Sequence, residues 1–167
     1  MNNYQFELVF ALLPNEDGEA YTDALFEAGC GDAGVGVGKL GSIALMFDRE
    51  AKSAHEAVES AIANVLTAIP HARLERTDKY LMNLSEIAEL VGTTKQNLSK
   101  YANGKSTYEA FPSPRIVSRS GTFWYFTEVA SWFEKNKLLQ IEPPQVELSR
   151  ELYRCNQVID EHRAIAV

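Results

Sequence analysis

The stretch NLSEIAELVGTTKQNLSKYANG, residues 83–104, has the pattern of two short helices joined by a tight turn. Its apolar residues over 84–91 recur with the spacing of one helix face. Gly92 follows directly, where a helix end needs a residue that tolerates a positive φ angle. A second amphipathic helix is predicted from Thr93 onward, and Gly104 is predicted to end it.

Both predicted helices carry capping signals at their first residues. Asn83 with Glu86, and Thr93 with Gln96, have the spacing of a capping box, in which each side chain bonds a backbone amide of the other residue. Two capped helices with a short glycine-containing turn are typical of a helix-turn-helix, whose second helix enters the DNA major groove. A helical hairpin in any small domain is the alternative on these residues alone.

The charge of the chain is distributed unevenly. Its 167 residues carry a net charge of −7, which on its own argues against binding nucleic acid. Residues 1–78 hold 5 Lys and Arg against 13 Asp and Glu, whereas residues 79–138 hold 8 against 5 and residues 139–167 hold 3 against 5. The segment with the two predicted helices is thus the basic one, and an acidic neighbouring domain does not prevent it from binding phosphate.

Residues 1–77 alternate between strand-like and helix-like segments. This order of strand, helix, strand, strand, helix, strand predicts a ferredoxin-like βαββαβ domain, with two helices on one face of a sheet. Such a fold supports many unrelated functions and does not indicate one by itself. The predicted strands are 4–13, 34–38, 43–48 and 72–76, and the predicted helices are 20–28 and 53–69.

The glycine-rich run GDAGVGVGKLG at residues 31–41 has two interpretations. A phosphate-binding loop is disfavoured, because the run lacks Gly-Lys-Ser/Thr and its glycines alternate along a strand instead of opening a helix. A structural role is favoured, with Gly34, Gly36 and Gly38 on one sheet face where they admit a closely packed element. Cys30 is interpreted as a packed thiol, since no histidine lies near it in the sequence.

The segment after the two helices is typical of a small hairpin followed by a third helix. The prolines of the sequence FPSP at 111–114 hold the chain extended. Two strands are predicted at 115–118 and 122–126, and they form a wing. A helix is then predicted over 128–137, with Thr127 as its cap.

The succession LSEIAELVG, TTKQNLSKYANG, FPSPRIV, SGTFWYF and TEVASWFEKN resembles the winged helix-turn-helix of the AlpA and excisionase group, which is related to MerR-type DNA-binding domains. The resemblance covers about residues 82–137, a third of the chain. It implies a winged helix-turn-helix fold that binds double-stranded DNA. The insert at 105–110 and the paired aromatic residues Trp124 and Tyr125 depart from the compact pattern of that group. No resemblance covers residues 1–77.

The second helix and the wing contain the residues expected to contact DNA. Gln96 and Asn97 can bond adenine in a bidentate manner, and the lysines can reach guanine or phosphate. Gln96 has the alternative role of capping its own helix. The wing arginines can touch phosphates or enter a minor groove, or they are solvated charges on a hairpin. The predicted DNA-binding residues are Thr94, Lys95, Gln96, Asn97, Ser99, Lys100, Arg115 and Arg119.

The last part of the chain predicts an extended Pro143-Pro144 linker followed by a helix over 146–166. An apolar seam on this helix has coiled-coil spacing but spans only about two heptads, too short to be stable alone. The seam can pack on its own N-terminal domain or on a second subunit. MerR-like regulators often dimerise through a C-terminal helix, so the resemblance favours a homodimer. The predicted dimerisation residues are Leu148, Leu152, Cys155 and Ile159.

The sequence offers little support for an enzyme, a metal site or a membrane protein. His55, His71 and His162 have no ligand spacing with cysteine or with one another, and no nucleophile or nucleotide motif is present. We therefore predict no catalytic residues, no cofactor and no bound metal. No apolar run approaches ~20 residues, and no secretory signal starts the chain, so we predict no membrane contact and a cytoplasmic location.

Together these features predict an α+β protein with a ferredoxin-like domain at 1–77, a winged helix-turn-helix domain at 78–139 and a C-terminal helix at 140–167. The predicted function is sequence-specific regulation of transcription, with an N-terminal domain that senses a small ligand or binds a protein partner. Two alternatives stay open. One is an excisionase-like architectural DNA-binding protein, and the other is an antitoxin-type interaction protein whose acidic N-terminal domain binds a basic partner.

Overall fold

The computed structural model is an α+β protein, which confirms the predicted fold class at that level. The chain forms two compact units, one of Met1–Asp78 with Arg150–Val167 and one of Lys79–Ser149. Residues 78–80 and 139–140, where the sequence predicts domain boundaries, lie outside the described residues. The structure describes residues 1–36, 38–77, 81–105, 107–138 and 141–166.

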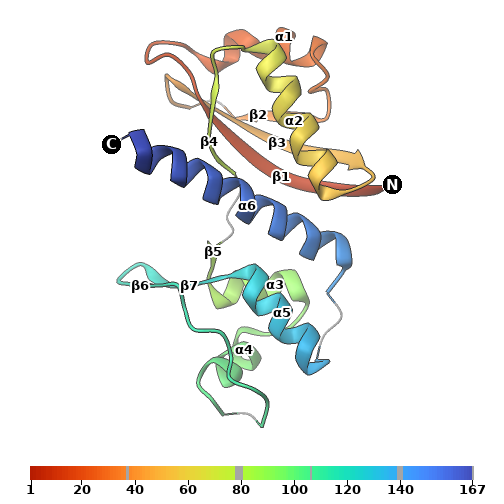
Figure 1. The fold of residues 1–167 in the computed structure, drawn as a ribbon, viewed down its shortest axis with the longest axis vertical. Helices are drawn as coiled ribbons and strands as arrows, with labels where there is room; N and C mark the ends of the chain where they lie inside the picture. The colour runs from red at the N-terminus through yellow and green to blue at the C-terminus, as the bar shows by residue number, and fades with distance from the viewer. Residues whose placement is uncertain (37, 78–80, 106, 139–140, 167) are drawn as a thin grey trace. The chain divides into compact units, whose positions relative to one another are not determined.

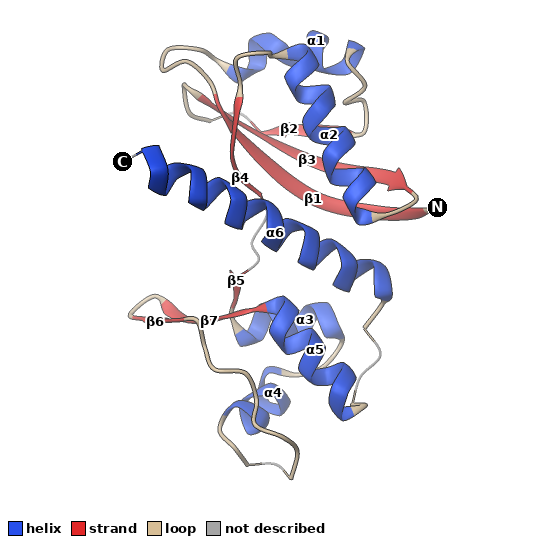
Figure 2. Cartoon of the chain, in the orientation of Figure 1, coloured by secondary structure: helices blue, strands red, loops and turns tan. Residues whose placement is uncertain are grey.

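The first unit is built on a four-stranded sheet in which all neighbouring strands are antiparallel, in the order β2-β3-β1-β4 (Figures 1 and 2). Cross-strand pairs such as Phe6 with Phe47 and Leu8 with Leu45 put buried apolar side chains on one face of the central strands. The predicted strand at 34–38 ends at Gly36, and its Val37 lies outside the described residues. The strands are β1 (Asn2–Ala11), β2 (Ala33–Gly36), β3 (Ser42–Ala51) and β4 (Arg73–Thr77).

Helices pack on the apolar face of this sheet (Figure 2). The longest helix before β4 is α2 (Ala54–Ala68). Its N-cap is Ser53, whose hydroxyl accepts the Glu56 amide at 3.1 Å. Its buried stripe faces the strands because apolar residues recur at helical spacing. The single helix predicted at 20–28 is instead a 3₁₀ turn, η1 (Gly18–Tyr21), followed by α1 (Thr22–Glu27).

A buried arginine lies between the sheet and the helices of the first unit. Arg49 on β3 points inward and is 7 % exposed. Its Nε and Nη2 donate to the two carboxylate oxygens of Asp32 at 2.7 and 2.9 Å. The remaining donors bond Ser60 Oγ at 3.1 Å, Asn64 Oδ1 at 2.9 Å and the Gly29 carbonyl at 3.0 Å. All five guanidinium N–H groups thus have acceptors, so the charge is buried without an unpaired donor.

This ion pair makes the stability of the first unit sensitive to acid. The hydrogen bonds from Arg49 hold the pKa of the Asp32 carboxyl below its ordinary value. Such a carboxyl contributes stability in full above its unfolded pKa of about 3.9, and the contribution is lost as pH falls through the lower folded pKa. We expect the difference in unfolding free energy between wild type and Asp32→Asn to shrink from about pH 5 to about pH 2, as measured by urea denaturation. A difference that stays constant over this range would contradict the ion pair.

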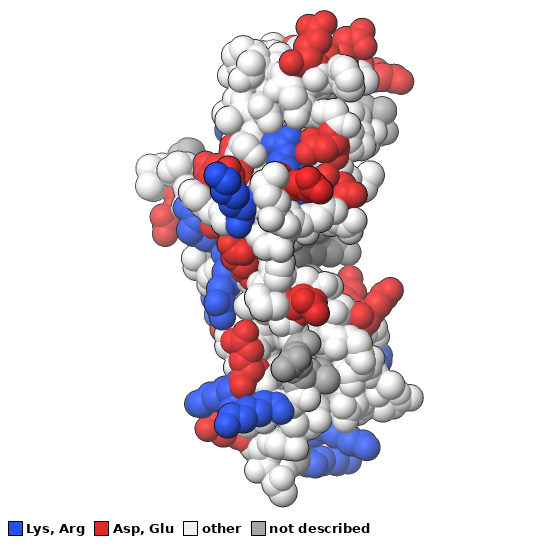
Figure 3. Space-filling model, turned by 90° about the vertical axis from the view of Figure 1, so that its right-hand side faces the viewer, with Lys and Arg blue, Asp and Glu red and all other residues white. Residues whose placement is uncertain are grey.

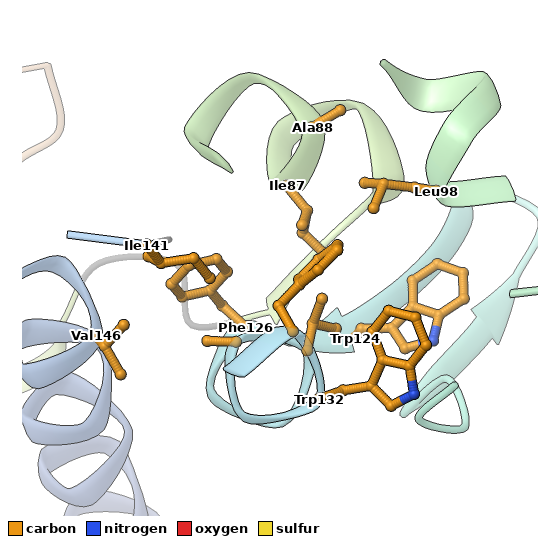
Figure 4. Packing of buried hydrophobic residues seen from close by; sticks show 11 residues of the cluster. Ile87, Ala88, Leu98, Trp124, Phe126, Trp132, Ile141 and Val146 are labelled. Atoms are coloured by element: carbon orange, nitrogen blue, oxygen red, sulfur yellow. The ribbon is translucent and has the colours of Figure 1, made fainter. Parts of the chain in front are cut away.

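The second unit has its own hydrophobic core (Figure 4). In this unit helices accompany a short sheet of order β5-β7-β6. Trp124, Phe126 and Trp132 are all buried in this core, with Ile87 and Leu98 contributed by the two helices of the 83–104 stretch. The elements are β5 (Leu81–Met82), α3 (Leu84–Val91), α4 (Lys95–Ala102), β6 (Ile116–Ser118), β7 (Gly121–Tyr125), α5 (Phe126–Asn136) and the start of α6 (Pro143–Ala166).

Two predicted helix starts in this unit are wrong. Helix α5 begins at Phe126, with Tyr125 at the N-cap position and no side-chain cap, so Thr127 is not its cap. Helix α6 begins at Pro143, although the sequence predicts an extended linker there. Proline suits the first turn of a helix, because its missing amide needs no partner at that position.

Gly92 ends α3 in the left-handed backbone conformation, with a φ angle of 74°. A Cβ atom built there meets no heavy atom within 4 Å, so replacing this glycine changes only the backbone energy. We expect Gly92→Ala to lower the unfolding free energy by about 1 kcal/mol. Gly92→Asn should lower it less, because asparagine tolerates this conformation better than alanine. Thermal denaturation of the two variants measures the difference, and equal losses would contradict a backbone origin.

Candidate nucleic-acid interface

The pair of helices α3 and α4 is defined by hydrogen bonds at the helix ends. The Asn83 side chain accepts the Glu86 amide at 2.9 Å, and the Glu86 carboxylate accepts the Asn83 amide at 2.9 Å, which confirms the predicted capping box. The Thr93 amide donates to the Ala88 carbonyl at 2.9 Å and closes the turn around Gly92. The helices are therefore joined by a tight turn (Figure 1).

The cap of α4 differs from the prediction. Thr94, and not Thr93, is the N-cap, and its hydroxyl accepts the Asn97 amide at 3.1 Å. The Thr93 hydroxyl instead accepts the Asn97 side-chain amide at 3.1 Å. Two consecutive threonines offer the same capping chemistry, so the sequence pattern cannot choose between them. As a consequence Gln96 is released from the predicted capping role, whereas the Asn97 side chain is held against the turn.

The inward side of α4 determines which of its residues face solvent. Leu98 is fully buried in the core of the second unit. Tyr101 packs against Trp132, with ring centroids 5.0 Å apart. Since successive residues turn by about 100° around a helix, Gln96 and Lys100 lie on the opposite side.

The outward side of α4 borders an open hollow of about 390 Å³. Three of its six lining residues are lysines and none is acidic, so the local potential is positive. Figure 3 shows basic side chains on the second unit, near the level at which Figure 1 draws α4. The hollow is lined by Lys95, Gln96, Ser99, Lys100, Asn103 and Lys105.

Four of the residues predicted on α4 are brought together around this hollow: Lys95, Gln96, Ser99 and Lys100. The other two predicted residues, Thr94 and Asn97, do not line it, because they form the start of the helix and its hydrogen bonds to the turn. Asn103 and Lys105 line the hollow but are absent from the prediction. Asn103 could have been found, since it follows Ser99 by four positions and therefore shares its helix face.

The hairpin of β6 and β7, where the sequence predicts a wing, holds the two predicted arginines differently. Arg115 Nε donates to the Tyr125 hydroxyl at 3.1 Å, and its guanidinium lies 5.4 Å from the centroid of the Tyr125 ring. Arg119 is exposed at the turn between the strands, flanked by Ser118 and Ser120, whose hydroxyls lie 2.7 Å apart. Neither arginine lines the hollow of α4. Arg115 is thus engaged by its own hairpin, whereas Arg119 stands at the exposed tip.

The residues predicted as a dimer seam lie on α6, and two of them are already covered within one chain. Leu152 and Cys155 are buried, and Leu148 and Ile159 are half-buried. Thr77 Oγ1 donates to the Leu152 carbonyl at 3.2 Å, which fastens the C-terminal part of α6 to the first unit. This part of the helix therefore packs on its own chain, one of the two arrangements that the sequence left open. The homodimer itself stays a prediction.

Comparison of the chain with models of protein families, with curated proteins and with solved structures finds no match in any of the three. Within the described ranges, no helix is long and apolar enough to cross a lipid bilayer.

Proposed function

We propose that this protein binds double-stranded DNA in a sequence-specific manner and regulates transcription. The observation that carries the proposal is the outward face of α4 together with Asn103 and Lys105 just after it, where three lysines and three uncharged polar side chains surround one hollow without an acidic residue. A recognition helix in the major groove needs such a face, because it must attract phosphates and offer donors and acceptors to base edges.

For the second unit we propose a winged helix-turn-helix arrangement. Its support is the succession of α3, a tight turn and α4, followed by the β6–β7 hairpin and by α5 in the same core. For the first unit we propose a ferredoxin-like arrangement. Its support is the strand order β2-β3-β1-β4 with every neighbour antiparallel. In this order β3 lies between β1 and β2, which α1 connects, and β1 lies between β3 and β4, which α2 connects.

The residues of α4, and Lys105 after it, have different roles in this proposal. Gln96 contacts base edges, since its amide is exposed and a glutamine amide can bond adenine N6 and N7 together. Lys95, Lys100 and Lys105 contact phosphate or guanine, because an ammonium group can donate to either. Asn97 makes no base contact in this proposal, because the turn before α4 holds its side chain.

The remaining parts of the proposal concern the wing and the partners. Arg119 contacts a phosphate, and Arg115 supports the wing through Tyr125. The acidic first unit senses a small ligand or binds a protein partner, and no catalytic role is proposed for it. Two copies bind a pseudo-palindromic site with half-sites about one DNA turn, ~34 Å, apart. Their interface lies outside Leu152 and Cys155, which are buried within one chain.

Selection from a library of randomised duplex DNA tests this function. The full chain is mixed with the library at about 0.15 M salt, because affinity for DNA depends steeply on ionic strength. We expect wild type to enrich one sequence motif and Gln96→Ala to relax the preference at one base position within it. If wild type enriches no motif over the input library, the proposed function fails.

A further inference from the structure

Four side chains with metal-binding chemistry meet where α2 and the C-terminal part of α6 pack together in the first unit (Figure 1). His55 and Glu59 lie four residues apart on α2, and Glu151 and Cys155 lie four residues apart on α6. Residues with this spacing share one face of a helix. Each helix therefore presents a pair of potential ligands to the other helix.

The distances place ligand atoms of His55, Glu59 and Glu151 around a common point, and the Cys155 thiol lies beside Glu151. His55 Nδ1 lies 3.1 Å from Glu151 Oε1, and Cys155 Sγ lies 3.9 Å from the same oxygen. One ligand atom from each of His55, Glu59 and Glu151 lies within 4.8 Å of the other two. Ligand atoms on a tetrahedral zinc ion are separated by roughly 3.3–3.8 Å, given bond lengths of about 2.0–2.3 Å. A tetrahedral set therefore needs rotations of the exposed His55 and Glu59 side chains and a change of the Cys155 rotamer that turns its thiol toward them.

The cluster is open to solvent on one side and closed on the other. His55 and Glu59 are exposed, whereas the Glu151 side chain is 11 % exposed and Cys155 is buried. An ion from solution can thus reach the His55 imidazole and the Glu59 carboxylate first. The Glu151 carboxylate and the Cys155 thiol lie deeper. A set of one thiolate, one imidazole and two carboxylates suits zinc better than magnesium or calcium, which prefer oxygen ligands alone.

We propose that His55, Glu59, Glu151 and Cys155 form a binding site for a divalent transition metal ion, with Zn²⁺ as the best-matched ion. Sequence spacing could not indicate this site, because the two pairs come from helices far apart in the chain, and Glu151 follows His55 by 96 positions. A bound ion links α2 to α6 and so fastens the C-terminal part of α6 to the first unit.

Arg154 competes with a metal ion for this site, because its guanidinium forms ion pairs with both carboxylates. Its Nη2 lies 2.6 Å from Glu151 Oε1 and 3.2 Å from Glu59 Oε1. Its side chain is 50 % exposed, so it can turn out to solvent when a metal ion arrives. In that exchange the guanidinium leaves the carboxylates, the Cys155 thiol gives its proton to water, and the ion binds the thiolate, the imidazole and both carboxylates.

Titration of the full chain with Co²⁺ tests the site, because cobalt absorption reports both a thiolate ligand and tetrahedral geometry. We expect one saturable site per chain, with a thiolate-to-cobalt charge-transfer band that Zn²⁺ abolishes by displacement. Cys155→Ser should remove that band. His55→Ala should weaken binding at least about tenfold, since even partners outside the ligand shell are worth that much. Arg154→Ala should tighten binding, because it removes the competing cation.

His162→Ala and Cys30→Ala are the matched controls, since each removes the same type of side chain elsewhere in the first unit. Both should bind cobalt like wild type, and circular dichroism checks that every variant is folded. If Cys155→Ser does not fold, the exposed variants His55→Ala and Arg154→Ala decide the question. The proposal is overturned if wild type gives no thiolate band at saturating cobalt, or if the controls lose binding as the cluster variants do. Because no DNA is present, this result is independent of the proposed DNA binding.

Discussion

Lys95→Glu combined with Lys100→Glu is expected to weaken specific DNA binding by about 100-fold or more, because two phosphate-neutralising cations become anions. Both lysines are exposed and line the hollow of α4. Each lysine that neutralises a phosphate adds about 0.9 to the slope of log affinity against log salt, so the slope should fall by about 2. Fluorescence anisotropy with the enriched duplex at several salt concentrations measures both quantities.

The matched control for this variant is Lys39→Glu combined with Lys52→Glu in the first unit, which changes the net charge by the same amount at exposed positions. It should bind DNA close to wild type, and both double variants should melt close to wild type, since exposed single charges contribute little to stability. If the control weakens binding as much as the α4 variant, overall charge alone governs binding and the α4 interface is contradicted.

Arg49→Met should destabilise the first unit by about 3 kcal/mol, because it leaves the Asp32 carboxylate without its countercharge. The Asp32 side chain is 31 % exposed, so water still solvates part of its unpaired charge. The loss of unfolding free energy is therefore at the lower end of the range for a broken buried ion pair. Ser60 and Asn64 also lose their donor. A loss of this size lowers the melting temperature by roughly 10 °C or more in a unit of this length. Chemical denaturation and calorimetry measure the two quantities.

Arg76→Met is the control for Arg49→Met, because Arg76 also lies in the sheet but pairs with Glu7 at the surface, at 3.3 Å. An exposed pair of this kind contributes less than about 1 kcal/mol. Adding Asp32→Asn to Arg49→Met should recover part of the loss, since it removes the unpaired charge. Equal losses for the two arginine variants would show that Arg49 contributes no more than a surface charge.

Elements whose signals lie within a few residues could be predicted from the sequence. The cap of α2 at Ser53 and the capping box at Asn83 and Glu86 are examples, because both partners of each hydrogen bond lie within one helical turn. Gly92 is another, since a glycine directly after an apolar helical repeat is typical of a helix end.

Features that join distant segments could not be predicted in this way. The strand predicted at 43–48 ends before Arg49, which occupies the next inward position of the observed strand. Strand β3 continues to Ala51, since Asp32, 17 positions earlier, neutralises the charge of Arg49. Similarly, the backbone amide of Thr77 donates to Asn156 Oδ1 at 3.0 Å, although the two residues are 79 positions apart. The apolar spacing of α6 does not indicate this buried polar contact.

The candidate DNA-binding site lies between these two cases. The polar face of α4 follows from helical spacing, so most of its residues could be named in advance. Which of these side chains are free to contact DNA could not be predicted. That depends on whether Thr93 or Thr94 is the N-cap, and therefore on whether Gln96 or Asn97 is held by the turn. The engagement of Arg115 by Tyr125 likewise depends on the pairing of β6 with β7.

NMR titration of the labelled chain with the enriched duplex shows whether the outward face of α4 and the tip of the β6–β7 hairpin contact DNA. Amide signals of residues 94–105 and 116–121 should shift or broaden most, with saturation at a fixed ratio of chain to duplex. Signals of the sheet and of α2 in the first unit should change little. Shifts confined to the first unit, or uniform small shifts that vanish at about 0.15 M salt, would contradict these contacts.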